Sequence, residues 1–518
     1  MSTPRARAIL ALILLLYLVL GVLFAAYTPR WQAPDEPAHY NYVRYLAENG
    51  RFPVLQMGDY PHEYMEEIKG RRFPPDLSID PIRYEYHQPP LYYSLAAPVY
   101  VLAKGALLPL RLLSVALGAG VVLLAYATGR RIFPGRPALG LASAAFVAFL
   151  PQHLATVSQA GNDVLAELLF ALVLFQLAGW VQDQESKIVN RKSAIALGFL
   201  LGLILITKTT AYIAVPLALG VLVWRWLRYR APARRILADL ARIAIPAALI
   251  ALPWYARNAT IYGWPDFLGL RRHDAVVVGQ LRLAEYLAQF GAASYLRRLG
   301  EFTFKSFWGV FGWQGVFMDS RIYLALAILC ALAAAGLVLR IVHRPPAHVA
   351  GQVSSIVNRK SSIVNRKSAL WLLAATILLT LLVYAGYNLQ FVQHQGRYLF
   401  TALIPIAVFF ALGWDEALQP RSSLLLALGL VLTGLGLVAW GVTTGPGLPK
   451  WPLALILAFA AIMALAGSIR DTKTGRSPQQ QEGAVSSIRN FLFFLPYVLL
   501  PLLSLYSLFG AILPQLAR

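Results

Sequence analysis

The sequence predicts an all-α polytopic membrane protein with about thirteen transmembrane helices and two long extracytoplasmic loops that carry interfacial helices. Of its 518 residues, 58% are hydrophobic and only 14% are charged. Mostly apolar stretches of about 18 or more residues, the length that a helix needs to cross a bilayer, recur along nearly the whole chain. We place the transmembrane helices near 8–27, 111–128, 138–156, 163–182, 194–207, 210–227, 236–256, 320–340, 369–388, 398–414, 422–442, 451–468 and 490–513.

The first apolar stretch follows a basic leader, as a secretory signal would. It is long for the apolar core of a signal, and many further apolar stretches come after it, so we expect an uncleaved first transmembrane helix. Cys330, the single cysteine, lies within an apolar stretch and leaves no intramolecular disulfide to form. We therefore treat 1–518 as a single integral-membrane domain.

The net charge of +22 is explained by topology, which argues against a nucleic-acid partner. Cytoplasmic ends of transmembrane helices carry an excess of Lys and Arg. With the N-terminus inside, the basic clusters at 130–131, 225–235, 340–344 and 470–476 all fall on the cytoplasmic side. This pattern predicts a multi-pass protein of the cell inner (plasma) membrane, with both long loops on the extracytoplasmic face.

The two long loops are 28–110 and 257–319, and both are rich in aromatic residues, proline and charge. Connections of this length within a bundle are usually functional. Within the first loop, the apolar stretch 89–108 is broken by Pro98 and lacks a basic flank after it, so we expect a helix in the outer membrane interface. The alternative, a true transmembrane helix, would reverse the orientation of everything downstream.

A short basic peptide recurs in the predicted cytoplasmic part of the chain. The sequence SKIVNRKS at 186–193 returns as SSIVNRKS at 354–361 and again at 361–368. Because the peptide has no periodic apolar face, we interpret 343–368 as a low-complexity insertion. A basic patch that contacts lipid is the alternative.

The segment APDEPAHY follows the first apolar stretch and contains two adjacent carboxylates, Asp35 and Glu36, with His39 close by. Ionised groups at the bilayer surface are costly and usually functional. Pro34 and Pro37 predict that no regular helix passes through the pair and that both acids lie on a stiff turn. We interpret the two acids as catalytic; a solvated loop is the alternative.

Further polar side chains occur at the outer ends of other predicted helices. Each cation alone could be an interfacial anchor for lipid phosphates. Cations gathered around a carboxylate base would instead form a site for an anionic lipid headgroup. With His39, we expect the substrate-binding residues to be His87, Gln88, Asp163, Lys208, Arg257, His394, Arg397 and Tyr398.

A metal is not required by any of these motifs, since no His or Cys spacing typical of a metal site is present. Asp35, Glu36 and Asp163 could still supply oxygen ligands to a divalent cation. We therefore expect no required cofactor, with a divalent cation as the alternative.

These motifs resemble the GT-C superfamily of integral-membrane glycosyltransferases. The acid pair, the QPPLYY segment, the lysine at the fifth helix, the RN pair at 257–258 and the QGRY segment are similar to bacterial protein-mannosyltransferase and aminoarabinose-transferase types, and to an uncharacterised bacterial family with a PDEPAH signature. The resemblance implies sugar transfer from a polyprenyl-phosphate donor on the extracytoplasmic side, with Asp35 as base and Glu36 its neighbour. Relatives often have Lys where Gln88 stands, so Lys208, Arg257 or Arg397 would contact more of the donor phosphate.

The residues support this chemistry without the resemblance, although other classes of protein stay open. Sugar transfer needs a base for the acceptor hydroxyl proton, and cations stabilise the departing phosphate. The acceptor could be a protein, a lipid or a glycan. A hydrolase using Asp35 and Asp163, a transporter or flippase of lipid-linked sugars, and a non-catalytic envelope assembly protein are the alternatives. Transporters commonly show a repeat of helix groups and mid-membrane charges, whereas here we find no such repeat and the charged residues cluster at one membrane face beside the long loops.

Overall fold

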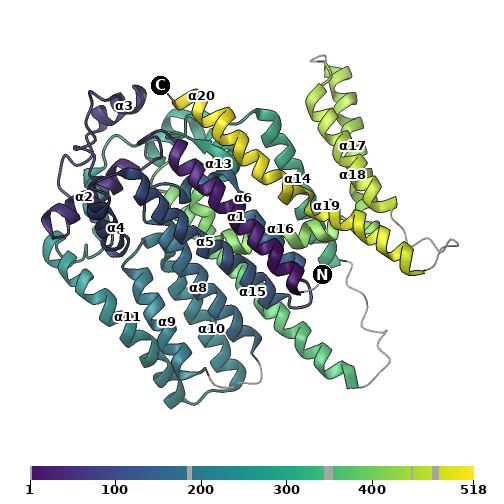
Figure 1. Ribbon diagram of the computed structural model, residues 1–518, viewed down its shortest axis with the longest axis horizontal. Helices are drawn as coiled ribbons and strands as arrows, with labels where there is room; N and C mark the ends of the chain where they lie inside the picture. Colours follow the sequence, from purple (N-terminus) through teal and green to yellow (C-terminus); the bar gives the residue numbers. More distant parts are fainter. Residues whose placement is uncertain (1–2, 184–188, 343–353, 445–446, 469–477, 518) are drawn as a thin grey trace. The chain divides into compact units, whose positions relative to one another are not determined.

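The computed structural model describes residues 3–183, 189–342, 354–444, 447–468 and 478–517, and these are almost entirely helical (Figure 1). The contacts within the chain define two compact units. The first unit comprises Met1–Phe317, Asn358–Pro405 and Ser504–Arg518, and the second comprises Met318–Val357 and Ile406–Leu503. The single integral-membrane domain expected for 1–518 stays a prediction beside this division.

The elements up to residue 317 all belong to the first unit. They are α1 (Thr3–Tyr27), α2 (Glu36–Asn49), α3 (His62–Gly70), η1 (Tyr84–His87), α4 (Leu91–Leu102), α5 (Leu107–Ile132), α6 (Pro137–Phe149), α7 (Pro151–Val157), α8 (Asp163–Gln182), α9 (Arg191–Leu205), η2 (Thr209–Ile213), α10 (Ala214–Tyr229), α11 (Ala233–Tyr262), α12 (Leu270–Val276), α13 (Leu283–Gly309), β1 (Val310–Phe311) and β2 (Val316–Phe317).

The remaining elements divide between the two units. They are α14 (Ser320–Val342), α15 (Ser354–Asn388), η3 (Gly396–Ala402), α16 (Leu403–Ala417), α17 (Pro420–Thr444), α18 (Lys450–Ser468), α19 (Pro478–Tyr506), η4 (Ser507–Ile512) and α20 (Leu513–Leu516). The predicted insertion at 343–368 is described only from residue 354, where α15 begins, and residues 343–353 lie outside the described residues.

Eleven helices of the described chain are long and apolar enough to cross a membrane. A twelfth arises if α6 and α7, which are bent by 63° at their junction, count as one span. The prediction of an all-α polytopic membrane protein is therefore confirmed, but the count of about thirteen is not. The helix expected near 194–207 is α9, whose 15 residues are fewer than the roughly 20 that a span requires.

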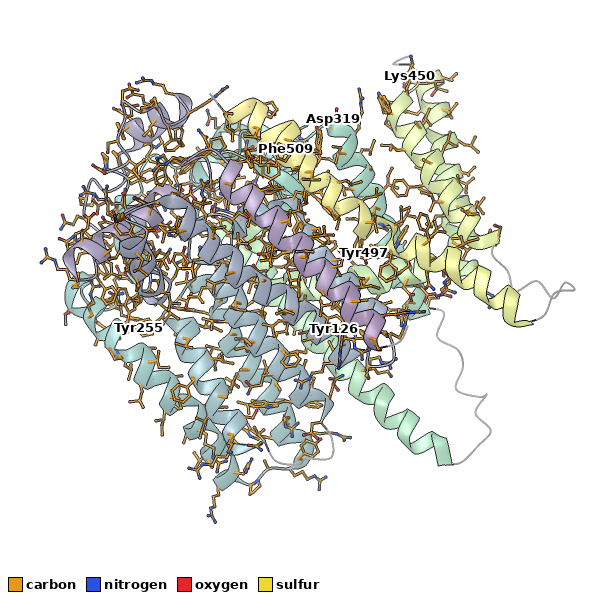
Figure 2. The ribbon with its side chains drawn as sticks, in the orientation of Figure 1. Tyr126, Tyr255, Asp319, Lys450, Tyr497 and Phe509 are labelled. Carbon is orange, nitrogen blue, oxygen red and sulfur yellow. The ribbon has the colours of Figure 1, made fainter. Side chains whose placement is uncertain are left out.

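The first unit is built around α5, which packs against α1, α6 and α8, while α9 packs against α11 (Figure 1). Small residues permit close approach of the helices: a Cβ on Gly129 of α5 would lie 2.8 Å from the Cα of Gly140 in α6. The chain returns to this unit at its end, where Phe509 contacts Tyr27 edge-to-face with ring centroids 5.7 Å apart (Figure 2). The C-terminal segment thus completes the unit that contains the site.

The first long loop is folded rather than extended, with α2 packed on α4. Tyr42 of α2 stacks on Tyr93 of α4 at a centroid distance of 3.5 Å, and both rings are fully buried. Helix α4 has 12 residues with Pro98 inside it, which is too short for a transmembrane helix. This length favours the interfacial interpretation of 89–108 over the transmembrane alternative.

In the second unit, α17 packs along α18, and α14 contacts both of these helices. The Trp414 indole N–H donates to the Leu492 carbonyl at 3.2 Å. Phe410 meets Tyr497, labelled in Figure 2, edge-to-face at 6.1 Å. The residues that the sequence analysis selected for the site all lie in the first unit.

Candidate active site

Asp35 occupies the N-cap position of α2 with a left-handed backbone (φ 69°). A non-glycine residue in this conformation is uncommon, and such strain collects at functional sites. Glu36 begins α2, and Pro37 lies in its first turn, where the missing N–H costs nothing. The prediction that no regular helix passes through the acid pair thus holds for Asp35 and is wrong for Glu36.

The Asp35 carboxylate is held by two residues distant in sequence. Arg397 Nη2 donates to Oδ2 at 2.5 Å, and the Tyr84 hydroxyl donates to Oδ1 at 2.8 Å. Burial alone would raise the pKa of Asp35, but the Arg397 charge and these hydrogen bonds outweigh it and lower the pKa to about 2. Asp35 is therefore ionised at neutral pH and remains 25% exposed, the most open member of the pair.

Arg397 is positioned by the residues immediately before it. Its Nε donates to Gln395 Oε1 at 2.7 Å. A Cβ on Gly396 would lie 2.2 Å from the Phe307 backbone nitrogen, so only glycine permits η3 to approach α13 this closely. The Cζ atom of Arg397 lies 5.5 Å from the centroid of the Tyr398 ring. The QGRY motif thus places one arginine fork against Asp35.

Glu36 points away from Asp35 into the protein interior. It is fully buried and accepts two hydrogen bonds from Arg111, at 2.8 and 2.6 Å. Its Oε1 also accepts from the Ala160 backbone N–H at 3.2 Å. The same Arg111 donates to the Ala25 and Thr28 carbonyls at the end of α1. These contacts leave Glu36 no access to a substrate and favour a positioning role.

Asp163 and Lys208 form a second ion pair, with Lys208 Nζ 2.7 Å from Asp163 Oδ1. Lys208 also donates to the Asn162 amide oxygen at 3.0 Å. Asn162 in turn donates to Gln88 Oε1 at 3.2 Å. Three of the predicted substrate-binding residues are therefore connected through an asparagine that the sequence analysis did not select.

The two predicted histidines of the first loop are both buried. His39 Nδ1 lies 2.8 Å from the Tyr93 hydroxyl, and the His87 ring lies 4.5 Å from that of His273. Burial lowers the pKa of His39 and lowers that of His87 well below the ordinary histidine value. Both imidazoles are thus neutral at pH 7 and suit hydrogen bonding better than binding of an anion.

Arg257 and His394 are not brought to Asp35. Arg257 donates to the Phe52 and Pro53 carbonyls, at 3.0 and 2.7 Å, and so fastens the first loop to α11. His394 is buried, and neither of its ring nitrogens has a hydrogen-bond partner in the described chain. Burial and the nearby Arg298 lower its pKa to about 4. Neither contact set supports the predicted phosphate-binding role.

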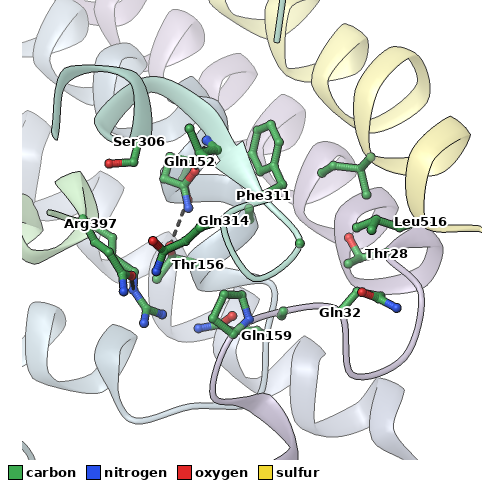
Figure 3. A pocket seen from close by; sticks show the side chains of 17 residues that line it. Thr28, Gln32, Gln152, Thr156, Gln159, Ser306, Phe311, Gln314, Arg397 and Leu516 are labelled. Atoms are coloured by element: carbon green, nitrogen blue, oxygen red, sulfur yellow. Dashed lines mark hydrogen bonds between the residues drawn. The ribbon is translucent and has the colours of Figure 1, made fainter. Parts of the chain in front are cut away.

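Two pockets adjoin at Arg397, which lines both of them. The first, which we call the amide pocket, is drawn in Figure 3, where Arg397 lies at one end and Leu516 at the other. Its lining is Thr28, Gln32, Ala33, Pro34, Gln152, Ala155, Thr156, Gln159, Ser306, Val310, Phe311, Gly312, Gln314, Gln395, Arg397, Ile512 and Leu516. The second, which we call the carboxylate pocket, is lined by Thr156, Asp163, Ala166, Glu167, Thr210, Arg397, Tyr398, Phe400 and Thr401.

Glu167, which lines the carboxylate pocket, pairs with the buried His153, and the sequence analysis missed both residues. His153 Nδ1 lies 2.7 Å from the Val147 carbonyl, which can only accept, so this nitrogen carries a proton. His153 Nε2 lies 3.1 Å from Glu167 Oε2, and one further proton must lie between them for a hydrogen bond. Both residues fall inside predicted transmembrane helices, and an ionisable residue there is itself a signal for a functional site.

A metal site is not evident in the part of the chain that the structure describes: no three His, Cys, Asp or Glu residues gather closely enough to hold an ion. Asp35, Glu36 and Asp163 each face a different basic partner, respectively Arg397, Arg111 and Lys208. The expectation that no cofactor is required and the alternative of a divalent cation both stay predictions.

Comparisons with known proteins agree with this architecture. The model of the dolichyl-phosphate-mannose-protein mannosyltransferase family matches residues 87–254. ArnT from Cupriavidus metallidurans, solved bound to undecaprenyl phosphate, is similar in structure with a TM-score of 0.52 and 15% identity, over 100% of this chain and 78% of ArnT. ArnT in the apo state gives a TM-score of 0.51 and 15% identity, over 99% of this chain and 77% of ArnT.

The apo oligosaccharyltransferase of Archaeoglobus fulgidus gives a TM-score of 0.46 at 13% identity, over 92% of this chain and 59% of that protein. A comparison with curated protein sequences finds no match. The matched segment 87–254 begins in η1 and reaches α11, so it includes the QPPLYY motif, Asp163 and Lys208. The family match and the fold shared with ArnT confirm the resemblance to the GT-C superfamily of integral-membrane glycosyltransferases, whose fold this chain has.

Proposed function

We propose that the protein is a glycosyltransferase that moves a sugar from a polyprenyl-phosphate donor to the hydroxyl group of an acceptor. The observation that carries this proposal is the ion pair of Asp35 and Arg397, in which the arginine lines two adjoining pockets. A base and a phosphate-binding cation are the two groups that the reaction needs, and here they are in direct contact.

The mechanism that we propose uses competition for Arg397. An arriving donor phosphate would take part of the guanidinium that Asp35 now occupies. Because the Arg397 charge is what holds the pKa of Asp35 near 2, its diversion to the phosphate makes the carboxylate a better proton acceptor. The donor would thus activate the base by binding.

The proposed reaction accounts for every bond formed and broken, and for the proton, without a cofactor. The Asp35 carboxylate takes the proton of the acceptor hydroxyl group, whose oxygen forms a bond to the anomeric carbon of the sugar. The bond between that carbon and the phosphate oxygen breaks, and polyprenyl phosphate leaves as an anion. Cations aimed at the departing phosphate stabilise the charge that develops on it, and an arginine fork can do so through two hydrogen bonds.

The donor class has independent support. ArnT, which shares the fold, was solved with undecaprenyl phosphate bound. In the present chain, Lys208 forms an ion pair with Asp163. Asp163 and Arg397 line the same pocket, so Lys208 is the second cation available to the donor. We therefore assign the phosphate to Arg397 and Lys208, with His39, His87, Gln88 and Tyr398 as surrounding substrate-contact groups.

Orientation follows from the distribution of basic residues. We infer that the clusters at 130–131 and 225–235 lie on the cytoplasmic side and that the Asp35 segment faces the extracytoplasmic side of the inner membrane. The acceptor, whether a protein, a lipid or a glycan, would therefore be a component of the cell envelope.

Purified protein in detergent tests the proposal, because a micelle has no two sides for a transporter to connect. We expect polyprenyl-phosphate sugar to be consumed and free polyprenyl phosphate to appear in the presence of an envelope extract as the source of acceptor. Asp35→Asn should slow this release by at least about 100-fold while donor binding persists. Donor binding without release by the unmodified protein, together with sugar movement across liposome membranes, would instead establish the flippase alternative.

A further inference from the structure

The amide pocket has an uncharged lining apart from Arg397 at its end. Among the described residues, its lining has no carboxylate and five glutamines, Gln32, Gln152, Gln159, Gln314 and Gln395. The carboxylate pocket, by contrast, has Asp163 and Glu167 in its wall. Two adjoining pockets that share one arginine thus offer different chemistry to their ligands.

Gln159 carries a group that the protein itself leaves without a partner. The residue is 4% exposed, and its Nε2 has no hydrogen-bond partner in the described chain. Buried amide groups are rarely left in this state, and each one calls for an explanation. Since the side chain lines the amide pocket, an acceptor oxygen of a bound ligand would satisfy it (Figure 3).

Other glutamines of the pocket are held in fixed orientations. The Val310 backbone N–H donates to Gln152 Oε1 at 2.8 Å, which leaves the Gln152 NH₂ group as a donor. Gln314 lies in the turn between β1 and β2 with a left-handed backbone (φ 70°), next to Trp313 (φ 54°). The Trp313 indole N–H donates to the Trp31 carbonyl at 2.9 Å and fastens this strained turn over the pocket.

The opposite wall is apolar, formed by Phe311, Ile512 and Leu516 among others. A sugar ring has hydroxyl groups at its edge and C–H groups on its faces, so amide donors on one side and hydrocarbon on the other complement it.

We propose that the amide pocket binds an uncharged glycosyl unit and discriminates against sugars that carry an ammonium group. An ammonium ion here would meet the Arg397 charge and would find no carboxylate in the lining. A sugar carboxylate would have to compete with Asp35 and with the donor phosphate for Arg397, the single cation among the described residues of the lining. The proposal rests on the proposed function for its ligand class, and the sugar could belong either to the donor or to an acceptor glycan.

Binding measurements test this inference separately from catalysis. Saturation-transfer NMR on the full-length protein in detergent would compare a methyl hexoside with the corresponding methyl glycoside of a 2-amino-2-deoxyhexose. We expect the neutral glycoside to bind at least about tenfold more tightly, the ratio typical of a site built from hydrogen-bonding groups. Equal binding, or tighter binding of the amino sugar, would overturn the proposal.

Gln159 variants locate the binding in this pocket. Gln159→Ala should lower the affinity for the neutral glycoside about tenfold. The isosteric Gln159→Glu adds a carboxylate and should therefore shift the binding preference towards the amino sugar. Gln56→Ala, which changes an exposed glutamine of the first loop, is the matched control and should change neither affinity. If Gln159→Ala does not fold, Gln314→Ala supplies the same test, and unchanged binding in folded variants of both residues would disprove the assignment.

Competition then identifies the source of the sugar. Displacement of the glycoside by a polyprenyl-phosphate hexose would assign the pocket to the donor sugar, and undisturbed binding at saturating donor would assign it to an acceptor glycan. Selective glycoside binding without transfer from any donor would refute the proposed function and leave this inference intact. Sugar transfer without selective binding of uncharged glycosides would refute this inference and leave the proposed function intact.

Discussion

Asp35 and Glu36 are neighbours in sequence, and each pairs with an arginine, yet the two ion pairs differ in every respect that bears on function. The Glu36–Arg111 pair has side chains 0% and 3% exposed, and every oxygen of Glu36 is engaged. The Asp35–Arg397 pair has side chains 25% and 10% exposed, and its arginine lines two pockets. A charged pair with all its hydrogen bonds satisfied inside the protein maintains structure, whereas one that opens onto a pocket can exchange partners.

The largest effect that we expect concerns the buried pair. Glu36→Gln leaves the Arg111 charge without its counter-ion in the interior, which should cost about 3–5 kcal/mol of stability. Thermal denaturation in detergent, followed by size-exclusion chromatography, would show this as a lower midpoint. Glu63→Gln, at an exposed position of α3, is the control. A normal midpoint combined with lost transfer would make Glu36 catalytic and erase the contrast between the two pairs.

Arg397→Ala should slow sugar transfer roughly 30- to 1,000-fold, because a charge-assisted contact to phosphate contributes about 2–4 kcal/mol to the transition state. Arg397→Lys should remain impaired, since a point charge cannot reproduce the guanidinium fork. Single-turnover rates at saturating donor measure the effect. Full turnover by both variants would show that Arg397 only maintains the position of Asp35.

Asp35→Asn should lower turnover by about 100-fold, at the lower end of general-base contributions, because the amide keeps the size of the side chain but cannot accept the proton. Donor binding should survive, since the phosphate-binding cations are unchanged. Parallel measurements of donor affinity and of transfer separate the two effects. Near-normal transfer would exclude Asp35 as the base.

The pH dependence distinguishes the two roles of Arg397. The pKa of Asp35 is about 2, below its ordinary value of 3.8, so the pair contributes stability that is present above pH 4 and lost as pH falls through 2. In Arg397→Ala, burial remains and the lowering charge is gone, so the acid limb of kcat/KM should move upward by about one pH unit or more. An acid limb that stays in place would show that Asp35 is not the titrating base.

The smallest effect on transfer should come from Arg257→Ala. Its contacts with the Phe52 and Pro53 carbonyls predict a loss of loop stability rather than of phosphate binding. Donor KM should therefore change by less than about threefold in the folded fraction. A tenfold rise in donor KM at an unchanged melting temperature would restore the phosphate-binding role that the sequence suggested.

The membrane fold could be predicted from the sequence because long apolar stretches have few alternatives in lipid. The acid motif also identified the segment that contains Asp35. The partners of the two acids could not be predicted from the sequence, because Asp35 and Arg397 are 362 residues apart and Glu36 and Arg111 are 75 residues apart. Arg111 begins the helix predicted at 111–128, and no motif marks it as the partner of Glu36. Nothing in the sequence alone separates an acid with its partners satisfied from one that is open.

The amide pocket was missed for a different reason. Glutamines have no periodicity or motif of their own, and Gln152 and Gln159 come together with Gln314 only after the helices pack. Glu167 and His153 did leave a signal, since both interrupt predicted transmembrane helices. The transmembrane helix predicted at 194–207 is α9 at 191–205, which is too short for a span because it ends before Lys208.

The two ion pairs can form only in a fixed order while the chain is being synthesised. A nascent membrane protein is made from its N-terminus, so Glu36 can meet Arg111 as soon as α5 has been inserted beside α1. Asp35 must wait for η3, because its partner Arg397 follows 362 residues later in the chain. The segment that bears Asp35 is therefore anchored early by Glu36, and the ion pair of Asp35 forms late. A truncated or stalled chain would hold the anchored loop and lack the half of the site that faces it.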